Sequence, residues 1–194
     1  MGEVRAGMLL VATPDLLDPN FADTVVLMLE VDGDGALGVV INKPSPVLVA
    51  DVLDPWAEVC AEPEVLFRGG PVSAEGALAV ARLRDPADPP LGFRRIAGIG
   101  DDAAGGGVVG LVDLDTPVEL VTDSLAGLRI FAGYAGWGAE QLAAEIEEGS
   151  WYVVPGEVPD VFRVDPEELK RDVLRRQPGE LAWHSTRPVD PDLN

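Results

Sequence analysis

The stretch "ADTVVLMLEVDGDGALGVVINK", residues 22–43, consists of two apolar runs separated by Asp-Gly-Asp-Gly. Asp-Gly pairs favour the backbone conformations of tight hairpins, so the stretch predicts two antiparallel strands joined at 32–35. The run Val25 to Leu29 does not alternate, and we therefore expect its strand to be covered on both faces. A calcium loop is the alternative, but no acidic residue occupies the final ligand position of an EF-hand loop. The hairpin is the favoured interpretation.

Short apolar runs between turn residues continue on both sides of this hairpin. They predict further strands at 8–13, 65–68, 77–84, 108–114, 127–131, 151–154 and 160–164. Cap residues and prolines predict helices that begin at 45–46, at 115–117 and at 165–166, and another helix follows 138. Residues 85–107 contain the most helix and strand breakers and predict a long excursion around one short strand.

Composition and charge limit the class of protein. The chain has 194 residues, of which 47% are hydrophobic, enough for one compact core. No apolar run is long enough to span a membrane, and we expect a cytoplasmic protein. The net charge of −20 disfavours direct binding of nucleic acid or of anionic membranes. We expect a single domain over residues 1–178, followed by a polar tail over 179–194.

Residues for familiar catalytic chemistry are scarce. Cys60 is the only cysteine and His184 the only histidine, so a cysteine- or histidine-rich metal site and a Ser-His-Asp triad lack support. We expect no cofactor and no metal, and a non-catalytic protein is favoured over an enzyme. Aspartate pairs such as Asp101 with Asp102 and Asp113 with Asp115 leave a carboxylate-based enzyme open as an alternative.

Eight of the fourteen cations fall in two places. On the C-terminal helix, Glu167 precedes Arg171 by four residues and Asp172 precedes Arg176 by four, the spacing of surface ion pairs. The other group flanks the proline-rich excursion and is a candidate anion site; it consists of Arg82, Arg84, Arg94 and Arg95.

The segment "FAGYAGWGAEQLAAEIEEGSW", residues 131–151, places three glycines before an acidic helix. Its G-x-x-G-x-G spacing is neither the dinucleotide fingerprint nor a nucleotide P-loop, and Glu140 disfavours a phosphate at the start of the helix. We interpret the glycines as sites of close backbone packing, with Tyr134 and Trp137 filling the crevice beside the helix. Leu142 and Ile146 then face the core, and a wall of an apolar ligand cleft is the alternative.

Taken together, "DPNF", "GALGVVINKP", "GGPV" and "GYAGWG" occur in the order and spacing of a bacterial family, and the chain resembles the YqgE/AlgH family from Gly7 to about Arg176. The resemblance implies an α+β fold, a single domain with a largely antiparallel, bifurcated sheet curled into a pseudo-barrel and flanked by helices. Some members have been labelled transcriptional regulators through a link to alginate production. The resemblance carries over no catalytic residues.

These observations favour a non-catalytic regulatory or adaptor protein that acts through an unknown protein partner or a small ligand. A DNA-binding regulator and an enzyme of unrecognised type are the alternatives. Folds often place ligands at strand ends, where the family-specific segments fall. The candidate cleft therefore consists of Asn20, Phe21, Asn42, Lys43, Arg68, Gly69, Gly70, Pro71, Tyr134, Gly136, Trp137 and Gly138.

Overall fold

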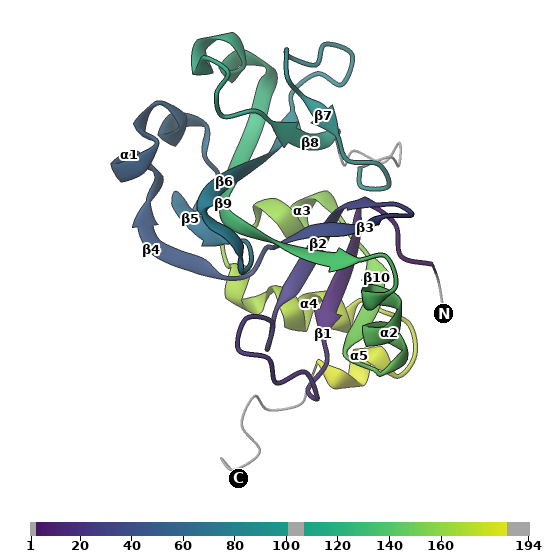
Figure 1. The fold of residues 1–194 in the computed structure, drawn as a ribbon. Coiled ribbons are helices and arrows are strands. Elements are labelled where there is room, and N and C mark those ends of the chain that lie inside the picture. Colours follow the sequence, from purple (N-terminus) through teal and green to yellow (C-terminus); the bar gives the residue numbers. More distant parts are fainter. Residues whose placement is uncertain (1–2, 101–106, 186–194) are drawn as a thin grey trace.

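The computed structural model describes residues 3–100 and 107–185 (Figure 1). The strands are β1 Met8–Ala12, β2 Val25–Val31, β3 Gly35–Val40, β4 Pro44–Leu48, β5 Val65–Arg68, β6 Val72–Leu83, β7 Arg94–Arg95, β8 Val109–Val112, β9 Leu125–Gly138 and β10 Trp151–Pro155. The α-helices are α1 Val49–Val52, α2 Gln141–Glu147, α3 Val158–Phe162, α4 Leu169–Arg175 and α5 Leu181–His184. Short 3₁₀ helices are η1 Asp54–Val59, η2 Val118–Leu120, η3 Thr122–Ser124 and η4 Pro166–Glu168. No helix in the described ranges is long and apolar enough to cross a membrane.

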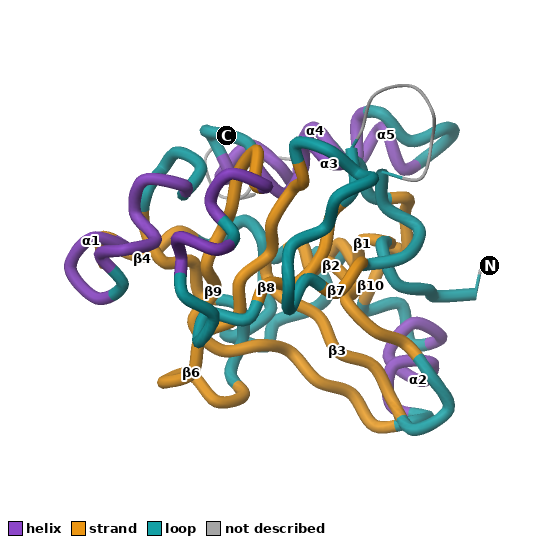
Figure 2. Tube along the Cα trace, turned by 90° about the horizontal axis from the view of Figure 1, so that it is seen from above, coloured by secondary structure: helices purple, strands orange, loops and turns teal. Residues whose placement is uncertain are grey.

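A single curled sheet organises the domain. Its strand order is β10-β1-β2-β3-β9-β6-β8-β7, with β4 and β5 as a side branch. All pairings between strands are antiparallel except that of β5 with β9. Figure 2 shows the curl from above. The residues after β7 return to the start of β1, because a Cβ added at Gly7 would lie 2.6 Å from backbone atoms of Gly98 and Ile99. The expected fold class is confirmed.

The long strand β9 creates the bifurcation. Its first part pairs with β6 and its last four residues, 135–138, pair with β3. Phe131 and Ala132, which pair with β6, also pair with β5. One strand therefore belongs to both halves of the sheet. Where its partner changes, the segment 69–72 passes close to residues Gly133 and Tyr134 of β9, and we call this contact the chain crossing.

Strands β1 and β2 are covered on both faces, as the sequence predicts for Val25 to Leu29. Val25, Leu27 and Leu29 belong to the core cluster that includes residues of α3 and α4, whereas Val26 and Met28 pack in the cluster that contains Leu142 of α2. The predicted hairpin is also confirmed. Asp32 stabilises its turn, since its Oδ1 accepts the N–H groups of Asp34 (2.8 Å) and Gly35 (3.1 Å).

Two predicted elements are wrong. Ser45 and Pro46 do not begin a helix; they lie in β4, and α1 begins only at Val49. A proline disfavours the helical conformation of the residue before it, so Pro44 and Pro46 favour an extended backbone at Lys43 and Ser45. The extended segment then pairs with β5 as the strand β4. Residues 160–164 are not a strand, because α3 occupies Val158–Phe162. A reciprocal capping box between Glu157 and Asp160 stabilises its first turn.

The glycine-rich segment also differs from the prediction, because β9 continues through Gly138 and no loop separates residues 133–138 from the strand. The expected close packing applies to Gly133, whose φ is +71° and whose added Cβ would meet the carbonyl oxygens of Gly70 and Val72. At Gly138 an added Cβ would meet nothing within 4 Å. Glycine is therefore required at Gly133, where β9 approaches another backbone segment, and not throughout the glycine-rich motif.

Candidate functional site

The sequence-predicted cleft separates into two groups of residues. Phe21 and Trp137 come together, with ring centroids 6.0 Å apart, and Trp151 completes this aromatic cluster. Glu145 of α2 accepts hydrogen bonds from both indole N–H groups at 2.9 Å. Its carboxylate thus connects α2 to the sheet, and the cluster performs a packing role. Leu142 is buried and Ile146 is half-buried against the same cluster, as expected.

The second group surrounds the chain crossing. Gly69 accepts from the Val40 N–H and donates to the Ala132 oxygen, both at 2.8 Å. An added Cβ at Gly70 would meet the backbone of Tyr134. Arg68 donates its N–H to the Lys43 oxygen at 2.8 Å, which brings two cationic residues side by side.

The remaining candidate cleft residues either lie apart from these two groups or already have hydrogen-bond partners within the protein. Asn42 is buried, accepts the Val25 N–H at 2.8 Å and donates to the Asp23 oxygen at 2.9 Å. Asn20 and Pro71 are exposed, and Gly136 and Gly138 lie in the part of β9 that pairs with β3. None of the twelve candidate cleft residues lines either of the two hollows described below.

The hollow that is lined by the larger number of charged side chains lies where β6, β9, the end of η1 and α3 meet. It has a volume of about 490 Å³. We call it the basic hollow; its lining is Glu58, Val59, Cys60, Ala61, Arg82, Arg84, Leu125, Ala126, Gly127, Val158, Pro159, Phe162 and Arg163. Three arginines and one glutamate line this hollow, in a chain that has 34 acidic and 14 basic residues.

Arg82 lies in β6 and Arg84 directly follows its last residue, and both are exposed while Ala81 and Leu83 are buried. Alternation along a strand therefore places both guanidinium groups on one face. Among the described residues, no carboxylate lies within ion-pair distance of either group, whereas Arg94 pairs with Glu30. Arg5, Lys43 and Arg68 share this property but line neither hollow. Of the four arginines proposed as an anion site, Arg82 and Arg84 line the hollow, and Arg94 and Arg95 lie in β7.

Arg163 belongs to the opposite wall and has carboxylate partners. It donates to Asp165 and to Asp172, each at 2.8 Å. The hydrogen bond to Asp165 is the largest influence that raises the pKa of this guanidinium above its ordinary value, against the opposing effect of burial. Its charge is thus shared with the acidic side chains, and Arg82 and Arg84 are the groups available to a ligand.

The floor of the basic hollow is open at Gly127. This residue pairs with Arg82 across the β6–β9 ladder, so a side chain there would lie on the same face as Arg82. An added Cβ at Gly127 would meet nothing within 4 Å. Cys60 also lines the hollow, but burial raises the pKa of its thiol to about 12 and keeps it protonated. Little reactive thiolate is therefore present at neutral pH.

Arg129 follows Gly127 by two residues in β9, so its side chain lies on the same face of the strand, and it is buried with 1% of its surface exposed. It donates to the carbonyl oxygens of Val161 (2.9 Å), Arg163 (3.1 Å) and Glu62 (2.6 Å). These bonds hold the end of α3 and the segment after Cys60 in place. Within the described ranges, no three His, Cys, Asp or Glu side chains gather closely enough to hold a metal ion.

Sequence reasoning identified Arg82 and Arg84 but missed Arg163, Gly127 and Cys60 as parts of one site. The alternate spacing of Arg82 and Arg84 was the available signal. Arg163 could not be placed, because residues 160–164 were predicted as a strand. The expected helix ion pairs are also wrong: Arg171 pairs with Glu168, and Arg176 pairs with Glu157 and with Asp160, which lies on α3.

Comparisons with known proteins agree in describing one family. Residues 9–182 match the family profile described as AlgH-like. A UPF0301 protein of Streptomyces avermitilis is 53% identical over 97% of this chain and 94% of the relative, and one of Thermobifida fusca is 50% identical over the same shares. A crystal structure of a Corynebacterium diphtheriae protein is similar, with a TM-score of 0.86 and 31% identity over 96% of this chain and 94% of that one. The solution structure of AlgH from Pseudomonas aeruginosa shares the fold, with a TM-score of 0.67 and 24% identity over 98% and 100%.

Proposed function

The chain belongs to the AlgH-like, or UPF0301, family, and from this premise we propose that it is a non-catalytic regulatory or adaptor protein that binds a small organic anion in the basic hollow. The family resemblance expected from the sequence motifs is thus confirmed. The observation that carries the proposal is the pair Arg82 and Arg84, which face an open hollow without a carboxylate partner among the described residues.

The chemistry of the hollow favours a particular class of ligand. Guanidinium groups bind carboxylate and phosphate in a forked geometry that a lysine does not reproduce. Leu125 of β9 and Val158 and Phe162 of α3 also line the hollow, and they suit an apolar body. The ligand class is therefore a small organic carboxylate or phosphate whose charged end contacts Arg82 and Arg84.

A thermal-shift screen at low ionic strength, followed by calorimetry, tests the proposal. The probes are inorganic phosphate, citrate, hexanoate, phenylbutyrate, glucose 6-phosphate, adenosine monophosphate and a short DNA duplex. A ligand at about a hundred times its dissociation constant adds roughly 2.7 kcal/mol of stability, or several degrees in Tm. We expect at least one organic anion to shift the wild-type Tm and inorganic phosphate to shift it less.

Three variants locate the binding. R82Q/R84Q should abolish the shift, and Gly127→Val should also abolish it by filling the open floor without changing charge. R171Q/R175Q on α4 changes the net charge equally and should retain the shift. Equal shifts in all variants would show binding elsewhere, and silence across the panel would contradict the small-ligand proposal. A shift produced by DNA alone, and lost in R82Q/R84Q, would favour a nucleic-acid-binding regulator instead.

A further inference from the structure

The outer edge of β6 is incomplete. Strand β8 pairs with β6 only from Ala79 to Arg82, whereas β6 begins at Val72. On the side of β8, the residues of β6 that precede Ala79 therefore have no strand partner in the described part of the chain. Figure 1 shows β8 as a short strand beside the longer β6.

The backbone groups of Ala77 point toward this open edge. Leu83 donates its N–H to the Val108 oxygen at 2.9 Å, toward the chain that forms β8. Successive residues of a strand direct their N–H and C=O groups to alternate sides. The register with β9 is regular from Ala77 to Arg82, and the shift between Arg82 and Leu83 skips Ala126 of β9 rather than a residue of β6. Ala81, Ala79 and Ala77 therefore share the edge of Leu83. Ala77 is the first of them that lies beyond the end of β8, and residues 113–115 make no backbone hydrogen bond to it.

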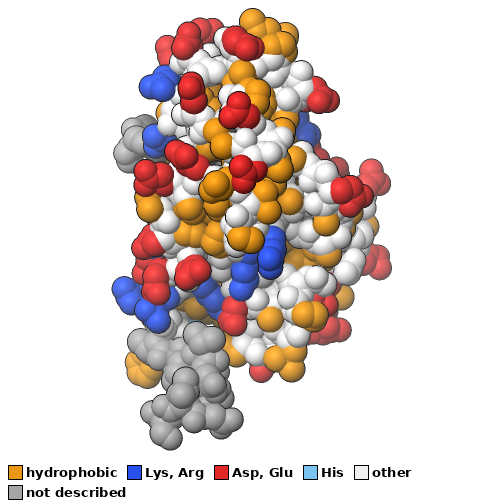
Figure 3. All heavy atoms as spheres, turned by 90° about the vertical axis from the view of Figure 1, so that its left-hand side faces the viewer, with side chains coloured by type: hydrophobic (Ala, Val, Ile, Leu, Met, Phe, Trp, Pro, Cys, Tyr) orange, Lys and Arg blue, Asp and Glu red, His pale blue; other side chains and the backbone are white. Residues whose placement is uncertain are grey.

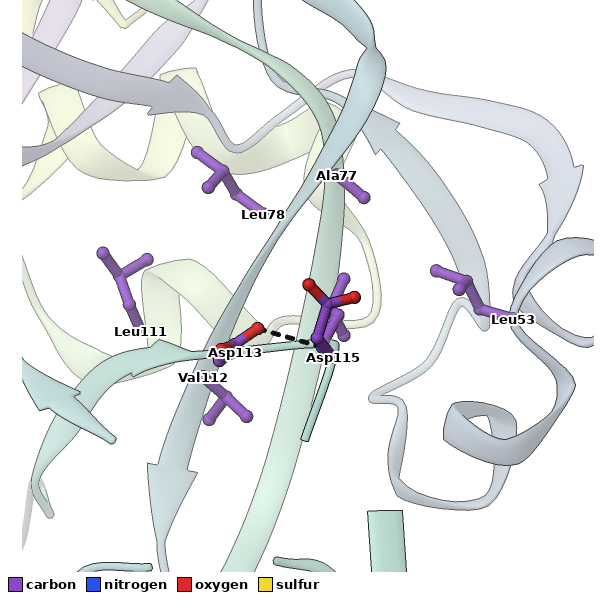
Figure 4. Close-up of a pocket in the computed structure, with 8 residues that line it drawn as sticks. Leu53, Ala77, Leu78, Leu111, Val112, Asp113 and Asp115 are labelled. Carbon is purple, nitrogen blue, oxygen red and sulfur yellow. Dashed lines mark hydrogen bonds between the residues drawn. The ribbon is translucent and has the colours of Figure 1, made fainter. Parts of the chain in front are cut away.

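A hollow of about 350 Å³ lies beside Ala77 (Figure 4). Its apolar lining comes from three elements of structure: Leu53 follows α1, Leu78 belongs to β6, and Leu111 belongs to β8. In Figure 4, Leu53 lies on one side of Ala77, and Leu78 and Leu111 lie on the other. A single large apolar side chain would fit such a volume at a strand edge.

Two carboxylates border the same hollow. Asp113 and Asp115 are exposed, and Asp113 Oδ1 accepts the Asp115 N–H at 2.9 Å. Within the described ranges, neither carboxylate has an ion-pair partner. Shortly before Leu53 in the chain, β4 and α1 contain the exposed apolar residues Val47, Leu48 and Val52. Figure 3 shows the face on which these elements lie, with apolar side chains interspersed with acidic ones.

We propose that the β6 edge at Ala77 is a docking site for an extended segment of a partner protein. The segment adds as a short strand, places one large apolar side chain in the hollow and directs a lysine or arginine to Asp113 and Asp115. Strand addition takes its affinity from main-chain hydrogen bonds and its specificity from side-chain pockets. The basic segment complements both these aspartates and the net charge of −20. The site is separate from the basic hollow, which attracts ligands of the opposite charge.

Fluorescence anisotropy with labelled synthetic peptides tests this site. The probes are acetyl-Lys-Thr-Xaa-Lys-Val-Thr-Lys-amide, with Leu, Ile, Phe or Met at Xaa, and matched peptides with glutamate in place of lysine. We expect at least one lysine peptide to bind at micromolar concentration and its glutamate counterpart to bind at least about tenfold more weakly. N-methylation at alternate amides should weaken binding about tenfold in one register and little in the other, because only one set of N–H groups faces β6.

The protein variants supply the matched comparison. D113N/D115N should weaken binding about fivefold or more, whereas D15N/D34N removes two exposed charges elsewhere and should have little effect. R82Q/R84Q should leave peptide binding intact, which separates this test from that of the basic hollow. Equal losses in both aspartate variants, equal tolerance of both N-methyl registers, or no binding of any lysine peptide at millimolar concentration would each overturn the proposal.

Discussion

The guanidinium of Arg129 lies over the ring of Phe67, with its Cζ 4.3 Å from the ring centroid, and both side chains are buried. Arg129 donates to three carbonyl oxygens, and no described carboxylate pairs with it. Burial lowers the pKa of this guanidinium to about 10, which leaves it charged at neutral pH. The buried cation thus joins β9, β5 and the end of α3, and it holds Arg163, which lines the basic hollow, through the backbone oxygen of that residue.

Replacement of Arg129 should therefore destabilise the fold. R129M retains an apolar stem but leaves three carbonyl groups without their donor, and we expect the free energy of unfolding to fall by about 3 kcal/mol. The exposed R171M should change it by less than about 0.5 kcal/mol. Urea unfolding followed by circular dichroism measures both. An R129M protein as stable as the wild type would show that the buried charge contributes nothing net.

The glycine-rich segment offers a matched pair of substitutions. Gly133→Ala forces a Cβ onto a residue with φ of +71° and against the oxygens of Gly70 and Val72, so we expect a loss of at least about 2 kcal/mol. Gly138→Ala adds a methyl group in open space within a strand and should be neutral or stabilise by about 0.5 kcal/mol. Thermal and urea unfolding compare the two variants. Equal effects would contradict the assignment of close packing to the chain crossing.

The ion pair between Asp23 and Lys170 (2.7 Å) connects the segment before β2 to α4 and predicts a dependence on pH. Its hydrogen bond with Lys170 lowers the pKa of Asp23 below 3.8, against the opposing effect of burial. A depressed folded-state pKa contributes stability above the unfolded pKa, and the contribution is lost as the pH falls through the lower folded value. Asp23 is more than half exposed, so D23N should cost less than about 1 kcal/mol at pH 7.

The same measurement at low pH completes this prediction. The difference between wild type and D23N should shrink as the pH falls from about 4 toward 2, because both residues are then uncharged. D15N, which removes an exposed carboxylate without an ion pair among the described residues, should show a smaller difference throughout. A D23N difference that persists unchanged at pH 2 would indicate a role in backbone geometry rather than charge.

Cys60 should be unreactive in the folded protein. With the pKa raised to about 12 by burial, roughly one thiol in ten thousand is ionised at pH 8. A disulfide reagent should therefore react several hundred times more slowly with the native protein than with protein in guanidinium chloride. Because the folded pKa lies above the ordinary 9.0, the related stability is present below pH 9 and is lost as the pH rises toward 12. Cys60→Ala should lack this component of the alkaline loss.

Local patterns predicted the elements whose own residues carry clear strand, turn or cap signals. The β2–β3 hairpin follows from apolar runs on either side of a four-residue turn, and β10 and α4 also follow from short-range signals. Ser45 and Pro46 misled the prediction, because the same residues that start a helix can lie in a strand when a partner is present. That partner is β5, about twenty residues further along the chain. Residues 160–164 misled it in the opposite direction, from strand to helix, because capping by Glu157 and the ion pair of Asp160 with Arg176 favour α3.

The sequence by itself determined the family, the strand-rich fold class, the covering of β2 on both faces and the acidic surface, because these depend on composition and on neighbours within a few residues. Only the tertiary structure decided which cations lack partners, which glycine meets another backbone, and where a strand edge stays open. Arg82, Gly127 and Arg163 form one hollow because β6 pairs with β9 and α3 packs nearby. Spatial proximity of residues distant in the chain depends on sheet register and helix packing, which no local pattern encodes.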